Sequence, residues 1–481
     1  MTKATPKKPH HWKYFLAGEF RDGGTPYEVR CPYDQEVAGI VHRAAPAELE
    51  EATRAAVEAF EAVRKLPAHR RKAILRAVET GLTARAEEFA RTLALEAGKP
   101  VRLARAEVQR AIFVFAQAAE EAHRLPGETL TLDAAPVGEG RQAIVRRFPV
   151  GPVAAVTPFN FPLMLVAHKL APAMAAGCPV VLKPASQTPM SALALAGLIA
   201  ESGWPAGALS VLPLASADAA PLVEDERFKL LTFTGSPVVG WDMKRRAGRK
   251  RVCLELGGNA AVIVHGDANL ELAADRVVMG GFAYAGQSCI SVQRVLVQRD
   301  VYDRFLSLFL PKVKALKIGH PLDEAADLSS LVAPSESVRV GRWFDEAEAA
   351  GARFLVGGHI EGHLVEPTVI ADAPPEANVN CREIFAPVVT VTPYQTFEEA
   401  LAMANASDFG LQAGVFTNDL RRAWRAFEAL EVGGVVINDV STWRVDHMPY
   451  GGVKQSGFGR EGIRYAIEEM TEPRLLVLNL S

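Results

Sequence analysis

From residue 153 onwards, short apolar runs alternate with helical segments, and this alternation constrains the fold more than any other feature of the chain. Buried strands are predicted, in chain order, at 153–156, 180–182, 209–212 and 230–233, with helices between them at 163–176 and 191–202. The alternation returns after Val262, with a strand at 292–297 between helices near 270–285 and at 300–315. Strands that alternate with helices over short loops form parallel sheets covered on both faces. The sequence therefore predicts two α/β domains, joined near 256–262.

The first third of the chain is predicted to be mainly helical. Within 46–66, apolar residues recur at spacings of three and four, which places them on one face of a helix. A second helix is expected over 70–97, because Gly98 suits the left-handed position after a helix and Pro100 cannot continue one. A third helix is expected over 101–123.

Two strand-like segments, 141–148 and 474–480, lie outside this regular alternation. Either segment could add a strand to the sheet of another chain. An ordinary edge strand within its own domain agrees equally well with the residues. The residues alone leave both readings open.

Length and composition exclude several classes of protein. The 481 residues exceed what one core usually supports, and 49% hydrophobic with 23% charged residues is typical of a folded globular chain. The net charge of -3 leaves no basic excess for a run of phosphates, so we expect no nucleic-acid partner. No stretch approaches the roughly 18 to 20 apolar residues of a membrane span. Residues 1–15 lack the apolar core and the cleavage site of a secretory signal.

The cysteines are odd in number and far apart, lying at Cys31, Cys178, Cys253, Cys289 and Cys381. Because no two of them form a CxxC pair, the sequence predicts neither a disulfide framework nor a metal site. We expect a reducing, cytoplasmic environment in which most of these thiols are buried and at least one is a candidate for chemistry.

Cys289 is the candidate nucleophile. Small residues precede it in the segment AGQSCIS at 285–291, so the backbone and a substrate can approach the thiol. A helix N-terminus or neighbouring amide groups would lower the pKa of this thiol. An inert core cysteine is the alternative, but Cys178 and Cys253 fit that description better because they sit beside apolar strand residues.

Glu255 is the candidate base. It ends an apolar strand and is followed by two glycines in the segment LELGGN. This position is poorly suited to a surface salt bridge, and partial burial would raise the pKa of the carboxyl group and make it a usable general base. A carboxylate that loop amides satisfy is the alternative.

Three further segments follow predicted strands, where ligands bind in open α/β sheets. Gly235 and Ser236 precede a helix that starts at Pro237, so free amides and the positive end of the helix dipole could bind a pyrophosphate, although the GxGxxG fingerprint is absent. Lys183, in VVLKPAS, could hold ribose hydroxyls or simply extend into solvent. Asn160, in TPFNFP, could donate to a developing oxyanion or stabilise a turn.

Taken together, these segments resemble the aldehyde dehydrogenase superfamily over nearly the whole chain. The motifs, in the order of that family, are EAGKP at 96–100, PFNFP at 158–162, KPAS at 183–186, FTGS at 233–236, ELGG at 255–258, GQSC at 286–289, EIFAP at 383–387 and PYGGVKQSGFGRE at 449–461. Each motif is a short match, but eight of them in the same order form a very specific signal.

The resemblance implies a role for each matched position. Cys289 matches the nucleophile, Glu255 matches the general base that activates the deacylating water, and Asn160 matches the side-chain half of an oxyanion hole completed by the backbone N–H of residue 289. Glu383 and Lys183 match the ligands of the two riboses, and Phe385 matches the residue that packs near the nicotinamide. The complete set implied to bind the cofactor is Lys183, Ser186, Gly235, Ser236, Glu383, Phe385 and Pro158.

The family's fold implies an α/β protein with three parts: a Rossmann-type dinucleotide domain, an α/β catalytic domain and a β-strand oligomerisation arm. In this sequence the dinucleotide domain corresponds to 1–123 and 147–255, the catalytic domain to 256–445, and the arm to 124–146 and 463–481. The arm implies a homodimer or a homotetramer.

The implied reaction is the NAD- or NADP-dependent oxidation of an aldehyde to its carboxylic acid through a thioester on Cys289, without a metal. Family members that pass the acyl group to coenzyme A typically lack the residue matched by Glu255, so its presence favours hydrolysis. Two rivals remain: a CoA-acylating dehydrogenase, and a binding or structural protein that keeps the fold without the activity. The intact Cys289, Glu255 and Asn160 argue against the second.

The preference for NAD or NADP depends on Ser186. NAD-preferring family members often carry Glu at this position, where it would hydrogen-bond the ribose 2′-hydroxyl and repel a 2′-phosphate. Ser186 is small and neutral, so the sequence predicts activity with both cofactors.

The substrate is expected to be a small hydroxylated or anionic aldehyde. The segment CISV at 289–292 looks like the lactaldehyde dehydrogenase branch, and KPAS also occurs in succinate-semialdehyde dehydrogenases. Arg110 and Arg444 lie near positions at which non-phosphorylating glyceraldehyde-3-phosphate dehydrogenases bind phosphate, but Ser288 stands where that branch often has Arg. Ordinary salt bridges are the alternative for both arginines.

Overall fold

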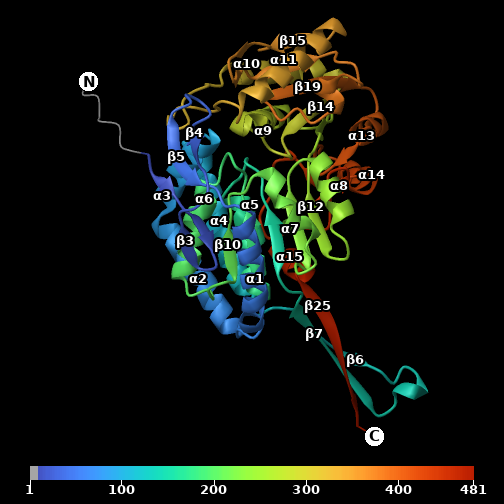
Figure 1. Cartoon of the computed structure of the whole chain (residues 1–481). Helices are drawn as coiled ribbons and strands as arrows, with labels where there is room; N and C mark the ends of the chain where they lie inside the picture. The colour runs from blue at the N-terminus through green and yellow to red at the C-terminus, as the bar shows by residue number, and fades with distance from the viewer. Residues whose placement is uncertain (1–8, 481) are drawn as a thin grey trace.

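The computed structural model describes residues 9–480 and contains two large sheets, each covered by helices (Figure 1). The first sheet has eight strands in the order β24-β12-β11-β8-β9-β10-β2-β3. Its five central strands are parallel: β8 (Val153–Val156), β9 (Val180–Lys183), β10 (Leu209–Val211), β11 (Leu230–Thr234) and β12 (Arg251–Glu255). The antiparallel edges are β24 (Gly457–Phe458), β2 (Tyr14–Leu16) and β3 (Glu19–Arg21).

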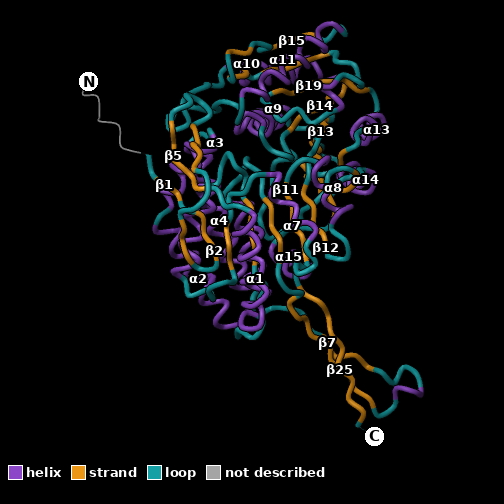
Figure 2. Tube along the Cα trace, viewed as in Figure 1, coloured by secondary structure: helices purple, strands orange, loops and turns teal. Residues whose placement is uncertain are grey.

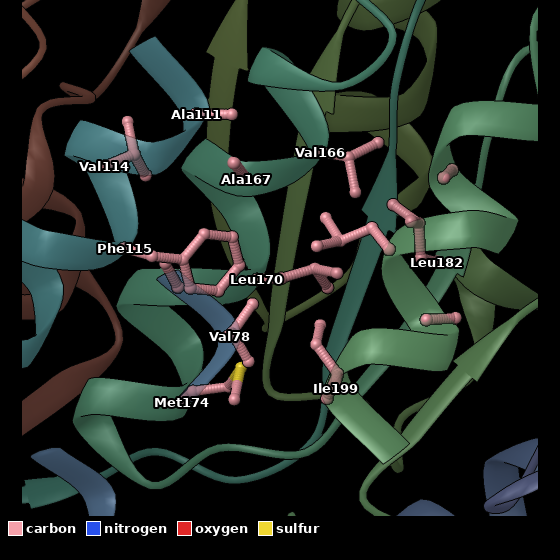
Figure 3. Close-up of a cluster of buried hydrophobic side chains, with 14 of the residues drawn as sticks. Val78, Ala111, Val114, Phe115, Val166, Ala167, Leu170, Met174, Leu182 and Ile199 are labelled. Carbon is pink, nitrogen blue, oxygen red and sulfur yellow. The ribbon is translucent and has the colours of Figure 1, made fainter. Parts of the chain in front are cut away.

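Helices cover both faces of this sheet, as the strand–helix alternation predicts. Successive residues of β8 point to opposite faces: Val153 and Ala155 belong to one apolar cluster, and Ala154 and Val156 to another. Figure 3 shows part of the first cluster, in which Phe115, Leu170 and Leu182 come together from two helices and a strand. The helices on this face are α2 (Ala68–Ala84), α3 (Ala86–Ala97), α4 (Val101–Glu121), α5 (Met164–Ala176) and α6 (Met190–Glu201). On the other face lie α1 (Pro46–Val63), α7 (Ala220–Glu224) and α8 (Pro237–Arg246).

The second sheet has seven strands in the order β15-β18-β19-β14-β13-β21-β22 and is parallel apart from its first strand. The strands are β13 (Ala260–Val264), β14 (Val292–Gln298), β15 (Arg353–Val356), β18 (Thr368–Ala371), β19 (Val388–Tyr394), β21 (Gln412–Phe416) and β22 (Gly434–Ile437). The helices around it are α9 (Leu270–Phe282), α10 (Tyr302–Lys314), α11 (Pro334–Ala349), α12 (Asn378–Cys381), α13 (Phe397–Asn405) and α14 (Leu420–Ala429). The two predicted α/β units are therefore both present.

Shorter strands complete the chain. A three-stranded sheet near the N-terminus contains β1 (His11–Trp12), β5 (Val37–His42) and β4 (Pro26–Arg30). Two small antiparallel pairs are β16 (Ile360–Glu361) with β17 (Leu364–Val365), and β20 (Phe409–Gly410) with β23 (Val453–Lys454).

Two helix predictions need correction. The helix predicted over 70–97 is two helices, because Arg85 has φ -111° and ψ 20° and interrupts the helical backbone between α2 and α3. The helix predicted near 270–285 ends at Phe282, because Tyr284 and Ala285 both adopt left-handed conformations with φ of 52°. The predicted end of α3 is confirmed, since Gly98 is left-handed with φ 62°.

The two strand-like segments outside the alternation pair with each other. β7 (Arg141–Pro149) and β25 (Thr471–Asn479) are antiparallel, β6 (Glu128–Thr131) adds a third strand, and the resulting arm extends away from both sheets (Figures 1 and 2). The range 463–481, which we assigned to the arm, divides in two. Its first part forms α15 (Ile463–Glu469) and packs into the apolar cluster of α4 and α5, so the strand of the arm begins at Thr471.

Residues 1–8 and 481 lie outside the described residues, so the expectation about the N-terminal leader and the outer limits of the predicted domains concern residues that the structure does not describe. Among residues 9–480, no helix is both long enough and apolar enough to cross a membrane. All five cysteines are free.

Candidate active site

A cavity of about 1360 Å³ lies where loops of both sheets meet. Its wall includes the loops that follow β8, β11 and β12, which are the carboxyl ends of parallel strands. Most of the residues that the sequence analysis singled out line this one cavity: Cys289, Glu255, Asn160, Pro158, Gly235, Ser236, Glu383, Phe385, Arg110 and Arg444. Lys183 and Ser186 are not among its lining residues.

Cys289 reaches the cavity on a tightly turned loop. Tyr284, Ala285 and Gly286 have φ of 52°, 52° and 68°, so three successive residues are left-handed just before the nucleophile. Gly258 packs against the main chain of Cys289, where a Cβ would lie 2.1 Å from the carbonyl oxygen of Cys289. A glycine is therefore required at 258, which explains one of the two glycines after Glu255.

The Cys289 thiol is not activated by its surroundings in the way we expected. Burial raises the pKa of the Cys289 thiol to about 12, and the nearby carboxyls of Glu383 and Glu255 act in the same direction. The hydroxyl of Tyr450 lies 3.2 Å from Sγ and, with Arg444, favours the thiolate, but these effects are smaller. Burial therefore outweighs the groups that favour the thiolate, and the net pKa of Cys289 is raised rather than lowered.

Glu255 ends β12 with its side chain buried at 3% exposure. Neither carboxylate oxygen has a hydrogen-bond partner among residues 9–480, so loop amides do not satisfy this group. Burial, and then the charge of Glu461, raises the pKa of Glu255 well above its ordinary value. The predicted upward shift is confirmed. A carboxylate with a raised pKa is a stronger base than an ordinary one.

The sequence analysis missed a buried ion pair behind Glu255. Lys169 and Glu461 are 1% and 3% exposed, and the Lys169 Nζ lies 3.0 Å from Glu461 Oε1. Lys169 also donates to Thr232 Oγ1 at 2.9 Å. Lys169 holds the pKa of Glu461 below its usual value, which keeps a negative charge close to Glu255. Lys169, next to His168 in the otherwise apolar segment 163–176, is a signal that could have revealed the pair.

Asn160 is 5% exposed and links the loop after β8 to the loop of the nucleophile. Its Nδ2 donates to the carbonyl oxygen of Gln287 at 3.1 Å, two residues before Cys289. Its Oδ1 has no partner within the described part of the chain. The amide nitrogen, rather than the oxygen, is therefore directed at the nucleophile loop.

Two of the residues expected to bind a dinucleotide, Gly235 and Ser236, lie at the start of α8. Gly235 joins β11 to this helix, and a Cβ at 235 would come within 2.4 Å of the Phe233 ring. Ser236 is the N-cap of α8, with extended backbone at φ -71° and ψ 146°. The amides of the first helical turn therefore open toward the cavity, as the sequence predicts.

Glu383 and Phe385 also line the cavity. The Glu383 Oε1 accepts a hydrogen bond from Gly258 N at 2.8 Å, and burial raises the pKa of Glu383 to about 7. Phe385 is left-handed with φ 50°, a strained conformation for an aromatic residue, and its ring packs edge-on against Phe159 with centroids 5.9 Å apart.

Lys183 and Ser186 lie at the carboxyl end of β9, beyond the cavity wall. Lys183 is 7% exposed and contacts the carbonyl of its own neighbour, Pro184, at 3.5 Å. Burial, together with the charge of Arg43, lowers the pKa of the Lys183 ammonium. The structure therefore places a poorly solvated cation at this strand end.

The two arginines differ in how their charge is satisfied. Arg110 forms a two-point ion pair with Asp446, with Nε 3.0 Å from Oδ2 and Nη2 2.6 Å from Oδ1. Arg444 is buried, and its Nε and Nη2 have no hydrogen-bond partner among the residues described. Its guanidinium stacks over the Tyr450 ring at 3.7 Å. Arg444 also forms an ion pair with Asp446, but a longer one, with Nη2 3.7 Å from Oδ1. The salt-bridge reading therefore holds for both arginines, although Arg444 keeps donors without a hydrogen bond on the wall that also carries Cys289.

A group outside the cavity brings ligand-type atoms together. Atoms of Cys31, Asp34 and His320 lie within 4.8 Å of one another. His320 already contacts Asp34 at 3.1 Å through Nε2 and accepts from Leu322 N at 3.1 Å through Nδ1. Protein contacts thus use both ring nitrogens of His320.

Comparisons with known proteins agree with this site. The model of the aldehyde dehydrogenase family matches residues 20–476. A 3-sulfolactaldehyde dehydrogenase of Priestia aryabhattai is 43% identical over the full length of both chains. Aldehyde dehydrogenase 21 of Physcomitrella patens, in complex with its reaction product succinate, is 46% identical over 98% of this chain and 99% of that one, with a TM-score of 0.97. A glyceraldehyde-3-phosphate dehydrogenase of Methanocaldococcus jannaschii complexed with NADP is 37% identical over 95% of this chain and 99% of that one, with a TM-score of 0.91.

The chain belongs to the aldehyde dehydrogenase family, and it is an oxidoreductase of that family. The resemblance inferred from the eight sequence motifs is confirmed.

Proposed function

We propose that this enzyme oxidises a small aldehyde with an anionic group at its far end to the carboxylic acid, using NAD or NADP. The observation that carries the anionic part of this proposal is Arg444. It is a buried cation whose Nε and Nη2 make no hydrogen bond among the described residues and whose ion pair with Asp446 is long, at 3.7 Å, and it lines the same cavity as Cys289. Burial opposes its charge, but Tyr450 and Asp446 keep the pKa of its guanidinium above the usual value. A buried cation without hydrogen-bond partners is costly unless a ligand satisfies it.

The reaction follows from three side chains. The Cys289 thiol releases its proton to water in the cavity as its sulfur adds to the aldehyde carbon, and the Asn160 amide with the backbone N–H of residue 289 stabilises the resulting oxyanion. When bound, NAD or NADP would supply the acceptor for the hydride on that carbon, and loss of the hydride would leave a thioester on Cys289. Glu255 then removes a proton from water, whose attack on the thioester releases the acid.

The residues around the cavity fit a dinucleotide. Pro158, Gly235 and Ser236 surround the open start of α8, where amides can bind a pyrophosphate. Glu383 provides an acceptor for ribose hydroxyls, and Phe385 provides an aromatic wall. Lys183 lies at the carboxyl end of β9, outside the lining of the cavity, and would provide a donor there. These roles are carried over from the family motifs, and the places of Glu383 and Phe385 in the cavity wall support them.

Two of the relatives are associated with anionic compounds. One acts on sulfolactaldehyde, which carries a sulfonate, and the other contains the dicarboxylate succinate. Both therefore have a negative group a few carbons from the reacting centre. Arg444 offers planar, paired donors that suit a carboxylate or a sulfonate. Arg110 gives weaker support, because Asp446 already neutralises it.

The test of this proposal is a panel of aldehydes matched in length, such as succinate semialdehyde against butanal and sulfolactaldehyde against lactaldehyde. We expect the anionic member of the better pair to have a kcat/KM about 10- to 100-fold higher, which corresponds to one charge-assisted hydrogen bond. Arg444→Leu should remove this advantage and leave kcat/KM for the neutral aldehyde nearly unchanged.

Arg425→Leu is the matched control, because Arg425 is an exposed arginine that pairs with Glu398 on the surface. This variant should leave the ratio of kcat/KM between the anionic and the neutral aldehyde unchanged in both pairs. Equal kcat/KM values for charged and neutral aldehydes in the parent enzyme would contradict an anionic substrate. An equal loss for both kinds of substrate in Arg444→Leu would assign Arg444 to structure instead.

Cofactor choice gives a second prediction. With Ser186 in place of an acidic residue, nothing at this position repels a 2′-phosphate, so we expect activity with both NAD and NADP. Michaelis constants for the two cofactors, measured at one saturating aldehyde concentration, provide the check. A strong preference for NAD would show that another residue discriminates between them. Ser186→Glu tests the position itself. If Ser186 lies beside the 2′ position, this variant should raise the Michaelis constant for NADP, and otherwise it should leave that constant unchanged.

We also propose a homodimer or homotetramer assembled through the arm. Leu475, Leu476 and Val477 on β25 are 57%, 54% and 45% exposed, which is unusual for neighbouring apolar residues on a monomer.

The five free cysteines suit a reducing compartment, and we propose a cytoplasmic location on that basis.

A further inference from the structure

The motif EAGKP contains a buried lysine that the proposed chemistry does not use. Lys99 lies in the corner between α3 and α4, where left-handed Gly98 ends one helix and Pro100 precedes the other. Its side chain is only 1% exposed. Burial lowers the pKa of the ammonium, and the neighbouring carboxylate of Glu107 counteracts this shift. A lysine in such a place is expensive to bury, so its contacts need an explanation.

The ammonium of Lys99 contacts both loops that form the reactive centre. Its Nζ donates to the main-chain carbonyl oxygen of Asn160 at 2.8 Å and also binds the Glu107 carboxylate. It lies 3.9 Å from the centre of the Phe161 ring and 4.4 Å from that of Tyr284. Phe161 is the neighbour of Asn160, and Tyr284 belongs to the left-handed turn before Cys289. One cation therefore lies between the loop of the oxyanion donor and the loop of the nucleophile.

Glu107 secures the far end of the same loop. Its Oε1 accepts hydrogen bonds from Leu163 N at 3.0 Å and Met164 N at 3.1 Å, which are the first free amides of α5. Its other oxygen binds Lys99. The ion pair therefore holds this loop at both ends. Lys99, in the corner before α4, binds it at Asn160, and Glu107, on α4, binds it at the start of α5.

Tyr284 connects the second loop to the same corner. Its hydroxyl donates to the carbonyl oxygen of Ala97 at 2.9 Å, two residues before Lys99. Its left-handed backbone is costly for a tyrosine and persists only if the surroundings hold it. The ring contact with Lys99 and the hydroxyl contact with Ala97 provide that support.

We propose that Lys99 is a positioning residue that sets the direction of the Asn160 amide relative to Cys289. By holding the main-chain carbonyl of Asn160 and lying between Phe161 and Tyr284, it fixes the distance between an oxyanion donor and the nucleophile. This inference rests on the proposed role of Asn160 as that donor. Lys99 touches neither the substrate nor the cofactor in this arrangement, so it acts entirely through Asn160.

A double-mutant cycle tests the inference on the full-length enzyme. Lys99→Met, Asn160→Ala and the double variant are compared with the parent enzyme in kcat, KM and thermal midpoint. We expect Lys99→Met to lower kcat by up to about 100-fold with little change in KM, because a small displacement of a catalytic group is enough for such a loss. The double variant should be about as slow as Asn160→Ala alone, since Lys99 has nothing to position once the amide is gone.

Three outcomes distinguish the claims. An unchanged kcat in Asn160→Ala would overturn both the proposed role of Asn160 and this inference. A slow Asn160→Ala combined with multiplicative losses in the double variant would overturn the inference alone. A slow Lys99→Met together with a double variant no slower than Asn160→Ala would support both, whereas an unchanged kcat in Lys99→Met would overturn the inference.

Glu96→Gln is the matched control for general loosening of this corner. Glu96 is also buried at 1% exposure, but its carboxylate binds Met190 N and Ser191 N at the start of α6 rather than the Asn160 loop. It should lower the thermal midpoint and leave kcat close to that of the parent, and an equal loss of kcat would contradict the inference. Should Lys99→Met fail to fold because Glu107 is left unpaired, Lys99→Met with Glu107→Gln removes both charges and enters the same cycle.

Discussion

Replacing Glu255 with glutamine is expected to leave a rapid burst of reduced cofactor but to slow steady turnover by roughly 10²- to 10⁴-fold. The burst persists because thioester formation does not require a base for water. Turnover slows because glutamine cannot take the proton of the water that cleaves the thioester. Stopped-flow absorbance of the reduced cofactor separates the two phases. An unchanged steady rate would remove Glu255 from the mechanism.

The same residue predicts the pH dependence of kcat. A base works in its ionised form, and burial with Glu461 nearby raises the pKa of Glu255 well above that of an ordinary carboxyl. Lowering the pH through this raised pKa protonates Glu255, so kcat should fall at a pH well above 4.5, and this decline should be absent in Glu255→Gln.

Product analysis with and without coenzyme A distinguishes hydrolysis from acyl transfer, since an acyl-CoA product would favour the CoA-acylating dehydrogenase.

Replacing Asn160 with alanine is expected to lower kcat by about 10²- to 10³-fold, the usual cost of removing one oxyanion donor. The side chain makes few other contacts, since Nδ2 donates to Gln287 O and Oδ1 has no partner within residues 9–480. KM should change much less than kcat, because the oxyanion exists only during the reaction. Steady-state kinetics with the best aldehyde of the panel provide the measurement.

Asn405→Ala provides the control for this variant. Asn405 also donates to a main-chain carbonyl, that of Ala429 at 2.8 Å, but it lies at the end of α13 away from the cavity wall. It should reduce stability without reducing kcat. A loss in Asn160→Ala no larger than that in Asn405→Ala would argue against an oxyanion role.

Local patterns in the sequence are enough to predict much of the fold and part of the candidate active site. The alternation after residue 153 predicts both parallel sheets because a strand and a helix are each recognised within about ten residues. Gly235, Glu255 and Cys289 are recognisable for the same reason: each follows a strand or a run of small residues, and loops after parallel strands converge at one edge.

The remaining features depend on contacts between distant segments. Nothing near Lys99 reveals that its ammonium meets Asn160, 61 positions along the chain. The raised pKa of Cys289 depends on the depth of the folded cavity, which no short segment encodes. Tyr284 continues a helical pattern in the sequence, yet its hydroxyl bond to Ala97 accompanies a left-handed backbone. In each case tertiary packing outweighs local preference.

The arm imposes an order on the synthesis of the protein. β7 is made before most of both α/β units, whereas its partner β25 follows them in the chain. Pairing of such distant strands is slow and must wait for β25, so β7 has an open edge while both α/β units are made. During this interval the unpaired edge is exposed to other nascent chains, and a ribosome that stops before codon 471 releases a subunit whose edge stays open.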